Sequence, residues 1–200
     1  MIQCNESEKV EISIEGDYFP LEENSEWKYL KECFSTTDDH AFLSSETVSH
    51  FIKGDTIIED IHYKKVVDEN GGIVKVVRKE GSKYYGRNHD LYIGFTNEYL
   101  FLDEDASLNS SWKHDKITYE TEYKVIGVNL THTFNDITYH NVMELQVSYY
   151  FQEGEELKLY YSTLHYYAKG IGEIYTYYPY PSSLTYSDLD ISLLKYTPHE

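Results

Sequence analysis

The chain has few cysteines, no long hydrophobic run and few basic residues, and each shortage excludes a class of protein. Two cysteines in 200 residues, Cys4 and Cys33, are too few for a disulfide framework and lack the spacing of a metal-binding knuckle. The longest apolar runs span only a few residues, so no membrane-spanning helix is expected. The 17 Lys and Arg against 35 Asp and Glu give a net charge of −18, which repels phosphate backbones. We therefore expect no nucleic-acid partner.

The signature motifs of common enzymes are also missing. The sequence contains no His-Glu-x-x-His zinc helix, no Gly-x-Ser-x-Gly elbow and no Walker loop. Gly170 and Gly172 have no third glycine after them, so they suit a bend or bulge in a sheet better than a phosphate cradle. We expect no catalytic residue and no cofactor. A hydrolase with a carboxylate pair stays an open alternative, because such pairs come together only in the fold.

Metal binding has weak support. His132, His140 and His165 could approach one another across neighbouring strands, but isolated histidines in strands are more often surface or packing residues. The acidic stretches at 68–72 and 103–107 do not place oxygens at the alternate positions of a calcium loop. We assign no metal site.

The most abundant feature is tyrosine, with 22 residues, and it occurs in segments that alternate apolar and polar positions as strands do. The stretch KITYETEYKV at 116–125 alternates throughout. The stretch 141–167 predicts a hairpin with Gly154 in its loop. Further strands are expected at 27–34 and at 43–52, the latter ending at a Gly54-Asp55 turn. We count ten to twelve strands in one domain, which is long enough to form a core without staples.

One phrase occurs twice: DIHYKKVV at 60–67 and DITYHNVM at 136–143. Each begins at the second residue of a polar pair that suits a tight hairpin turn, Glu59-Asp60 in the first copy and Asn135-Asp136 in the second. We infer two loosely similar halves, about 17–110 and 111–200, although chance similarity of strand sequences is the alternative. The predicted fold is all-β, an antiparallel curved sheet that forms a half-barrel or open barrel.

The first residues differ from the rest of the chain. Residues 1–16 are charged and without periodicity, which predicts a flexible tether before a single β domain at 17–200. MIQC followed by NESEKVE is similar to the end of a bacterial lipoprotein signal peptide, and Cys4 is then the residue that carries the lipid. The alternative is an ordinary disordered cytosolic N-terminus. We expect a cell-envelope location if the native start carries a signal peptide, and a cytoplasmic one otherwise.

Several motifs together resemble a group of secreted, uncharacterised lipoproteins of Bacteroidetes-type bacteria. The motifs are DYFPLEENSEWKY at 17–29, GDTIIEDIHYKKV at 54–66 and HYYAKGIGEIYTYY at 165–178. The resemblance implies a mostly antiparallel β protein in the cell envelope, with no established activity.

The best candidates for a binding surface are tyrosines of the late strands, because tyrosine makes large contacts at low entropic cost. We select Tyr149, Tyr161, Tyr167, Tyr175 and Tyr177 as ligand-binding candidates on a concave sheet face. The ligand is open among a carbohydrate, an apolar small molecule and a protein. The simpler alternative is that these tyrosines only cover a half-buried sheet.

We therefore expect a non-enzymatic binding or scaffolding lipoprotein, whose only contact with a membrane is the lipid on Cys4. A different function, as an acidic inhibitor or immunity-type protein for a basic partner, would follow from the charge of −18.

Overall fold

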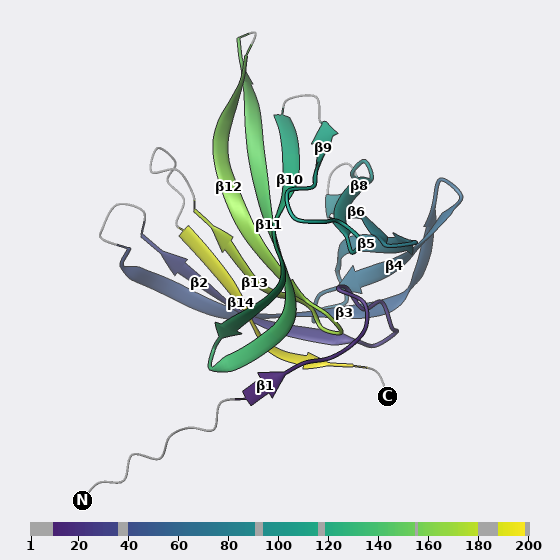
Figure 1. The fold of residues 1–200 in the computed structure, drawn as a ribbon. Coiled ribbons are helices and arrows are strands. Elements are labelled where there is room, and N and C mark those ends of the chain that lie inside the picture. The colour runs from purple at the N-terminus through teal and green to yellow at the C-terminus, as the bar shows by residue number, and fades with distance from the viewer. Residues whose placement is uncertain are drawn as a thin grey trace, which may run out of the picture.

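A single long, strongly curved sheet makes up the computed structural model of the chain (Figure 1). The structure describes residues 10–35, 40–90, 94–115, 119–154, 156–179 and 188–198. In chain order the strands are β1 (Val10–Ile12), β2 (Glu26–Phe34), β3 (Phe42–Ile58), β4 (Ile61–Val67), β5 (Ile73–Glu80), β6 (Lys83–Asp90), β7 (Gly94–Phe95), β8 (Tyr99–Asp103), β9 (Ser111–Asp115), β10 (Tyr119–Phe134), β11 (Ile137–Glu153), β12 (Glu156–Ala168), β13 (Gly172–Tyr178) and β14 (Asp188–Thr197). Within these ranges there is no helix that is long and apolar enough to cross a membrane.

The strand order consists of two meanders joined along one seam. Strands β2 to β6 pair with their neighbours in sequence order, and strands β9 to β14 do the same. Antiparallel pairing of β14 with β2 joins the two meanders, and β7 and β8 both pair with β6. The path of paired strands ends at β7 and β9, so the sheet is open. The predicted all-β, antiparallel, curved sheet is confirmed, with 14 strands in place of the expected ten to twelve.

The two copies of the repeated phrase begin at matching hairpin turns. Glu59 and Asp60 have φ values of 52° and 63°, and Asn135 and Asp136 have φ values of 50° and 62°. Two consecutive residues with a left-handed backbone conformation form a turn whose twist matches that of the flanking strands, so both predicted turns are confirmed. The third residue after each turn is a tyrosine that is 2% exposed, Tyr63 in one copy and Tyr139 in the other. The internal repeat itself stays a prediction.

Two local expectations need correction. The Gly54-Asp55 pair does not end a strand, because β3 continues through it to Ile58. The register shifts between Ile52 and Asp55, and Gly54 has a φ of 71°, so the glycine serves a β-bulge, which needs the same backbone freedom as a turn. Order also starts before Asp17, because Val10–Ile12 pair in parallel with β11.

The core is one cluster of buried residues that joins strands of both meanders. Trp27 stacks on Phe19, with 5.5 Å between ring centroids, and its indole N–H donates to the carbonyl of Ile171 in the β12–β13 turn. Gly172, the first residue of β13, has a φ of 109°, and a Cβ there would lie 2.9 Å from the Trp27 indole nitrogen. The glycines of the Gly-x-Gly motif therefore allow a tight bend against the core, as predicted. The predicted 141–167 hairpin is likewise present as β11 and β12, with Gly154 at a φ of 68° in its turn.

Candidate functional site: a tyrosine-lined hollow on the concave face

Two adjoining pockets hollow the inner face of the sheet. Their volumes are about 230 and 140 Å³, and both are lined by Asn88, Tyr99, Tyr123 and Tyr149. These side chains come from β6 and β8 of the first meander and from β10 and β11 of the second. Because strands from both ends of the sheet line the same space, the hollow lies on the concave face that Figure 1 shows.

The larger pocket contains one carboxylate, Glu173 of β13, among the residues that line it. Glu173 Oε1 lies 2.7 Å from Nδ1 of His165 and accepts a hydrogen bond of 2.8 Å from the hydroxyl of Thr176. Burial by itself would raise the pKa of Glu173. The hydrogen bond and charge of His165, together with the charge of Lys75 and the Thr176 bond, outweigh burial and lower the pKa to about 2. Glu173 is therefore ionised at neutral pH.

His165 is held on both sides of its ring. Its Nε2 lies 2.9 Å from the hydroxyl of Thr163, which completes a hydroxyl, imidazole and carboxylate row with Glu173. Rows of this kind activate nucleophiles in hydrolases. Thr163, however, has no exposed surface, and its hydroxyl also reaches the carbonyl of Val147 at 3.4 Å. A nucleophile must reach its substrate, so this row orients His165 and does not present a nucleophile.

Lys75 places a cation at the other side of the pocket. Its ammonium lies over the rings of Phe19 and Phe101, at 5.0 and 5.2 Å from their centroids. Burial lowers the pKa of Lys75, and the charge of Glu173 partly opposes this effect. Burial, assisted by Lys75, also lowers the pKa of nearby His50. The pocket thus offers a fixed anion and a fixed cation between aromatic rings.

Aromatic rings continue from the pocket toward the tip of the β11–β12 hairpin. Tyr149 stacks on Tyr161 with 4.6 Å between centroids. Farther along, Phe151 packs between Tyr119 and Tyr160, at 5.7 and 5.1 Å. Phe151 and Tyr160 are 41% and 37% exposed. A row of rings that starts in a polar pocket and becomes exposed along a hairpin can hold a flat, polyhydroxylated ligand by stacking.

The structure separates the five tyrosines that we selected from the sequence. Tyr149 and Tyr167 line the larger pocket, and Tyr161 is the cross-strand neighbour of Tyr149. Tyr175 and Tyr177 lie on the opposite face, since they pair with Tyr166 and Leu164, which neighbour the pocket residues in β12. A register shift between Tyr166 and Tyr167 causes this change of face within β13. Their proposed roles in binding stay predictions.

Several pocket residues were missed at the sequence level. Glu173, Lys75, Tyr99 and Tyr123 come from strands far apart in the chain, so no local motif could reveal them. The only local signal was Glu173 itself, a carboxylate in the otherwise uncharged strand GEIYTYY.

The three histidines that could have converged do not. His165 bonds Glu173 in the pocket, His132 packs against Tyr166 at 4.8 Å, and His140 lies 3.1 Å from the hydroxyl of Thr131. Within the described ranges, no group of three or more His, Cys, Asp or Glu could hold a metal ion. Cys4 lies outside the described residues.

The fold and the hollow define a class of protein: an open, mostly antiparallel sheet with a polar, tyrosine-lined pocket on its concave face. No family model and no curated protein sequence matches the chain. A solved structure from Bacteroides fragilis, described as a "putative exported protein with YmcC-like fold", has a TM-score of 0.52 and 8% identity, over 92% of this chain and 100% of that one. A "putative lipoprotein" from Parabacteroides distasonis has the same identity and coverage and a TM-score of 0.46. The first likeness establishes a shared fold, which is the fold that the resemblance implied.

Proposed function

We propose that this protein binds a carbohydrate in the concave hollow and does not change it chemically. The observation that carries the proposal is the convergence of Tyr99, Tyr123 and Tyr149 with the charged groups of Glu173 and Lys75 in one pocket. Sugars present an apolar ring face and a rim of hydroxyls, so a site for them needs flat aromatic rings together with fixed hydrogen-bonding groups. The mixed lining supports a carbohydrate over the apolar small molecule that the sequence left open.

The proposal extends to the location of the protein. We propose that the chain acts in the cell envelope, attached by a lipid on Cys4. The N-terminal MIQC stretch and the resemblance to secreted lipoproteins support this location. The description of the Bacteroides fragilis structure as an exported protein agrees with it. Fractionation of the native host, with antibody against this chain, tests the location.

Isothermal titration with defined hexasaccharides, such as maltohexaose, cellohexaose and chitohexaose, tests the binding proposal. We expect at least one of them to bind, and Tyr149→Ala to weaken that binding about tenfold, because a stacked ring contributes on the order of 1 kcal/mol. Tyr177→Ala is the matched control, since it removes a tyrosine of the same region from the opposite face. Equal loss in both variants would contradict a site in the hollow, and a broader glycan panel with no binder would contradict the ligand class.

A further inference from the structure

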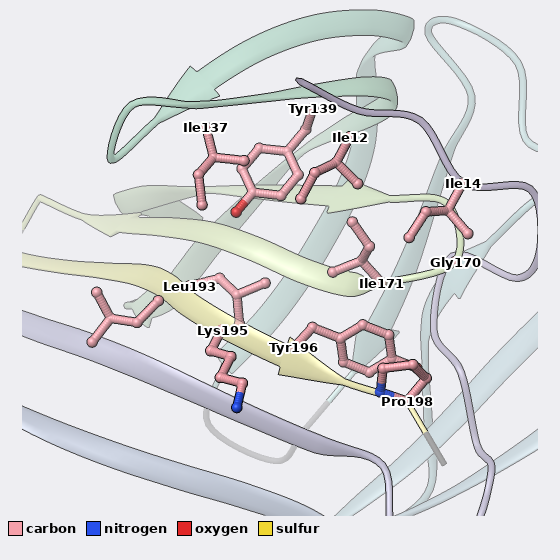
Figure 2. Close-up of a pocket in the computed structure, with 11 residues that line it drawn as sticks. Ile12, Ile14, Ile137, Tyr139, Gly170, Ile171, Leu193, Lys195, Tyr196 and Pro198 are labelled. Carbon is pink, nitrogen blue, oxygen red and sulfur yellow. The ribbon is translucent and has the colours of Figure 1, made fainter. Parts of the chain in front are cut away.

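A second, apolar groove lies outside the hollow, between the N-terminal segment and the last strand (Figure 2). Its volume is about 330 Å³. Ile12 and Ile14 form one wall, and Ile171, Leu193 and Tyr196 form the opposite surface. Ile14 is 41% exposed and Leu194 at the edge is 39% exposed, so the groove opens to solvent. An exposed groove with such walls suits an alkyl chain.

One polar atom in this apolar groove has no partner. Tyr139 is 2% exposed and lines the groove, and Figure 2 shows its hydroxyl directed across it, above Leu193. No hydrogen bond to this hydroxyl is found among the described residues, and it is not one of the fully buried unpaired atoms, so it faces the open groove and is available to a ligand. Burial raises the pKa of Tyr139 to about 12, so the hydroxyl keeps its proton and can donate.

The repeated phrase provides an internal comparison. Tyr63 holds the position in the first hairpin that Tyr139 holds in the second, and it is equally buried. The hydroxyl of Tyr63 donates to the carboxylate of Glu98 and accepts a bond of 3.1 Å from Nε of Arg87. The same residue in the same local structure is thus satisfied within the protein at one site and left with a free donor at the other.

Two lysines near the groove lie on the other face of the sheet. Lys195 belongs to the lining of the groove, and Lys28 is its cross-strand partner in the β14–β2 seam. Lys28 lies between the buried residues Trp27 and Tyr29, and successive residues of a strand point to opposite faces, so both lysines point away from the core face. Figure 2 shows the Lys195 amine directed away from the Tyr139 hydroxyl. The Tyr139 hydroxyl therefore provides the polar contact in the groove, and a carboxylate is a strong acceptor for such a donor.

We propose that this groove binds a single-chain fatty acid. The alkyl chain lies between Ile14, Ile171 and Tyr196, and the carboxylate accepts the Tyr139 hydrogen bond. A peptide would fit less well, because each of its residues brings an N–H and a C=O that the apolar walls cannot pair. The groove is separate from the carbohydrate site, so either proposal can fail without the other.

Calorimetric titration of the full chain with sodium dodecanoate, below its micelle concentration, tests the proposal. We expect one equivalent to bind. Tyr139→Phe removes only the free hydroxyl, so it should weaken binding roughly tenfold, as expected for a bond to a charged acceptor, and leave the unfolding midpoint unchanged. Tyr63→Phe is its matched control: it removes a satisfied hydroxyl, so it should lower the unfolding midpoint and leave dodecanoate affinity unchanged.

Charge placed in the groove gives a second test. Leu194→Glu at the exposed edge should abolish dodecanoate binding, and Leu159→Glu should not, because Leu159 is also exposed but lies on the β11–β12 hairpin. Dodecyltrimethylammonium should not bind the wild-type protein. No dodecanoate binding, binding that both Tyr139→Phe and Leu194→Glu leave intact, or equal binding of the cationic detergent would overturn the proposal. Binding to anionic lipid vesicles without binding of free dodecanoate would also overturn it, and would assign the groove to a membrane surface.

Discussion

At the residue scale, Glu173 shows how a carboxylate stays ionised on a largely aromatic sheet face. Three groups from three strands compensate its burial: His165 of β12, Thr176 of β13 and Lys75 of β5. The part that Lys75 contributes depends on the curl of the sheet, because β5 and β13 belong to different meanders. Glu173 therefore links the electrostatics of the pocket to the stability of the fold.

This arrangement predicts a defined pH dependence. The pKa of Glu173 is about 2 in the folded protein, against an ordinary value of 4.5, so the unfolded chain binds the extra proton first as pH falls. The stabilisation is complete above pH 4.5 and is lost as pH falls toward 2. Urea unfolding of wild type and Glu173→Gln should differ by on the order of 2–3 kcal/mol at pH 6, and the difference should shrink below pH 4.

The exposed loop residue Glu69 supplies the control for that measurement. Glu69→Gln removes the same charge from an exposed turn outside the hollow. Its effect on the free energy of unfolding should therefore be within a few tenths of a kcal/mol. A Glu173→Gln difference that is independent of pH would contradict the role of the ionised carboxylate.

At the element scale, the turns and bulges decide which face each side chain takes. The Asn135-Asp136 turn starts β11 in register, and the shift between Tyr166 and Tyr167 then reverses the faces along β13. As a result, Glu173 points into the hollow while Tyr175, two residues later, lies on the opposite face. Strict alternation would have put both on the same side.

The left-handed turn residues give a test of this role. Asp136 has a φ of 62°, which glycine adopts freely and a β-branched residue adopts only with strain. Asp136→Gly should therefore stabilise the protein by about 0.5 kcal/mol, and Asp136→Val should destabilise it by about 1–2 kcal/mol. Chemical unfolding measures both. Asp60 has nearly the same φ, so the two substitutions at Asp60 should act in the same directions; opposite signs would show that contacts outweigh turn geometry.

At the scale of the whole molecule, the charge of −18 acts on every element together. Most ion pairs have at least one partner at the surface, and in the pair of Lys158 with Glu153 both side chains are exposed, so screening by water limits what these pairs contribute. Repulsion among the unbalanced carboxylates is therefore expected to dominate the response to salt.

We accordingly expect sodium chloride to stabilise the protein. Between about 10 and 500 mM salt the repulsion is screened, so Tm at pH 7.5 should rise by a few degrees. Circular dichroism in the β-sheet band measures this change. A fall in Tm would mean that ion pairs outweigh repulsion. The same salt range distinguishes carbohydrate binding from the alternative function as an acidic inhibitor. An acidic inhibitor would lose affinity for a basic partner steeply as salt rises, whereas ring stacking on a neutral sugar would not.

The sequence by itself determined the local architecture, because alternation and turn chemistry act over a few residues. The 141–167 hairpin, the turns at 59–60 and 135–136, and the bend at Gly170 and Gly172 all follow from such short-range rules. The failure at Gly54 has the same origin, since a bulge and a turn require the same backbone freedom of glycine.

Only the tertiary structure decided the sites. The pocket joins Lys75 with Glu173, which are almost a hundred positions apart, and the groove joins Ile14 with Tyr196, from the two ends of the chain. The partner of a tyrosine hydroxyl was equally beyond local rules: Tyr63 and Tyr139 lie in matching phrases, yet only Tyr63 meets Arg87 and Glu98. Such contacts depend on how the two meanders curve and join, which is set by packing and register over the whole sheet.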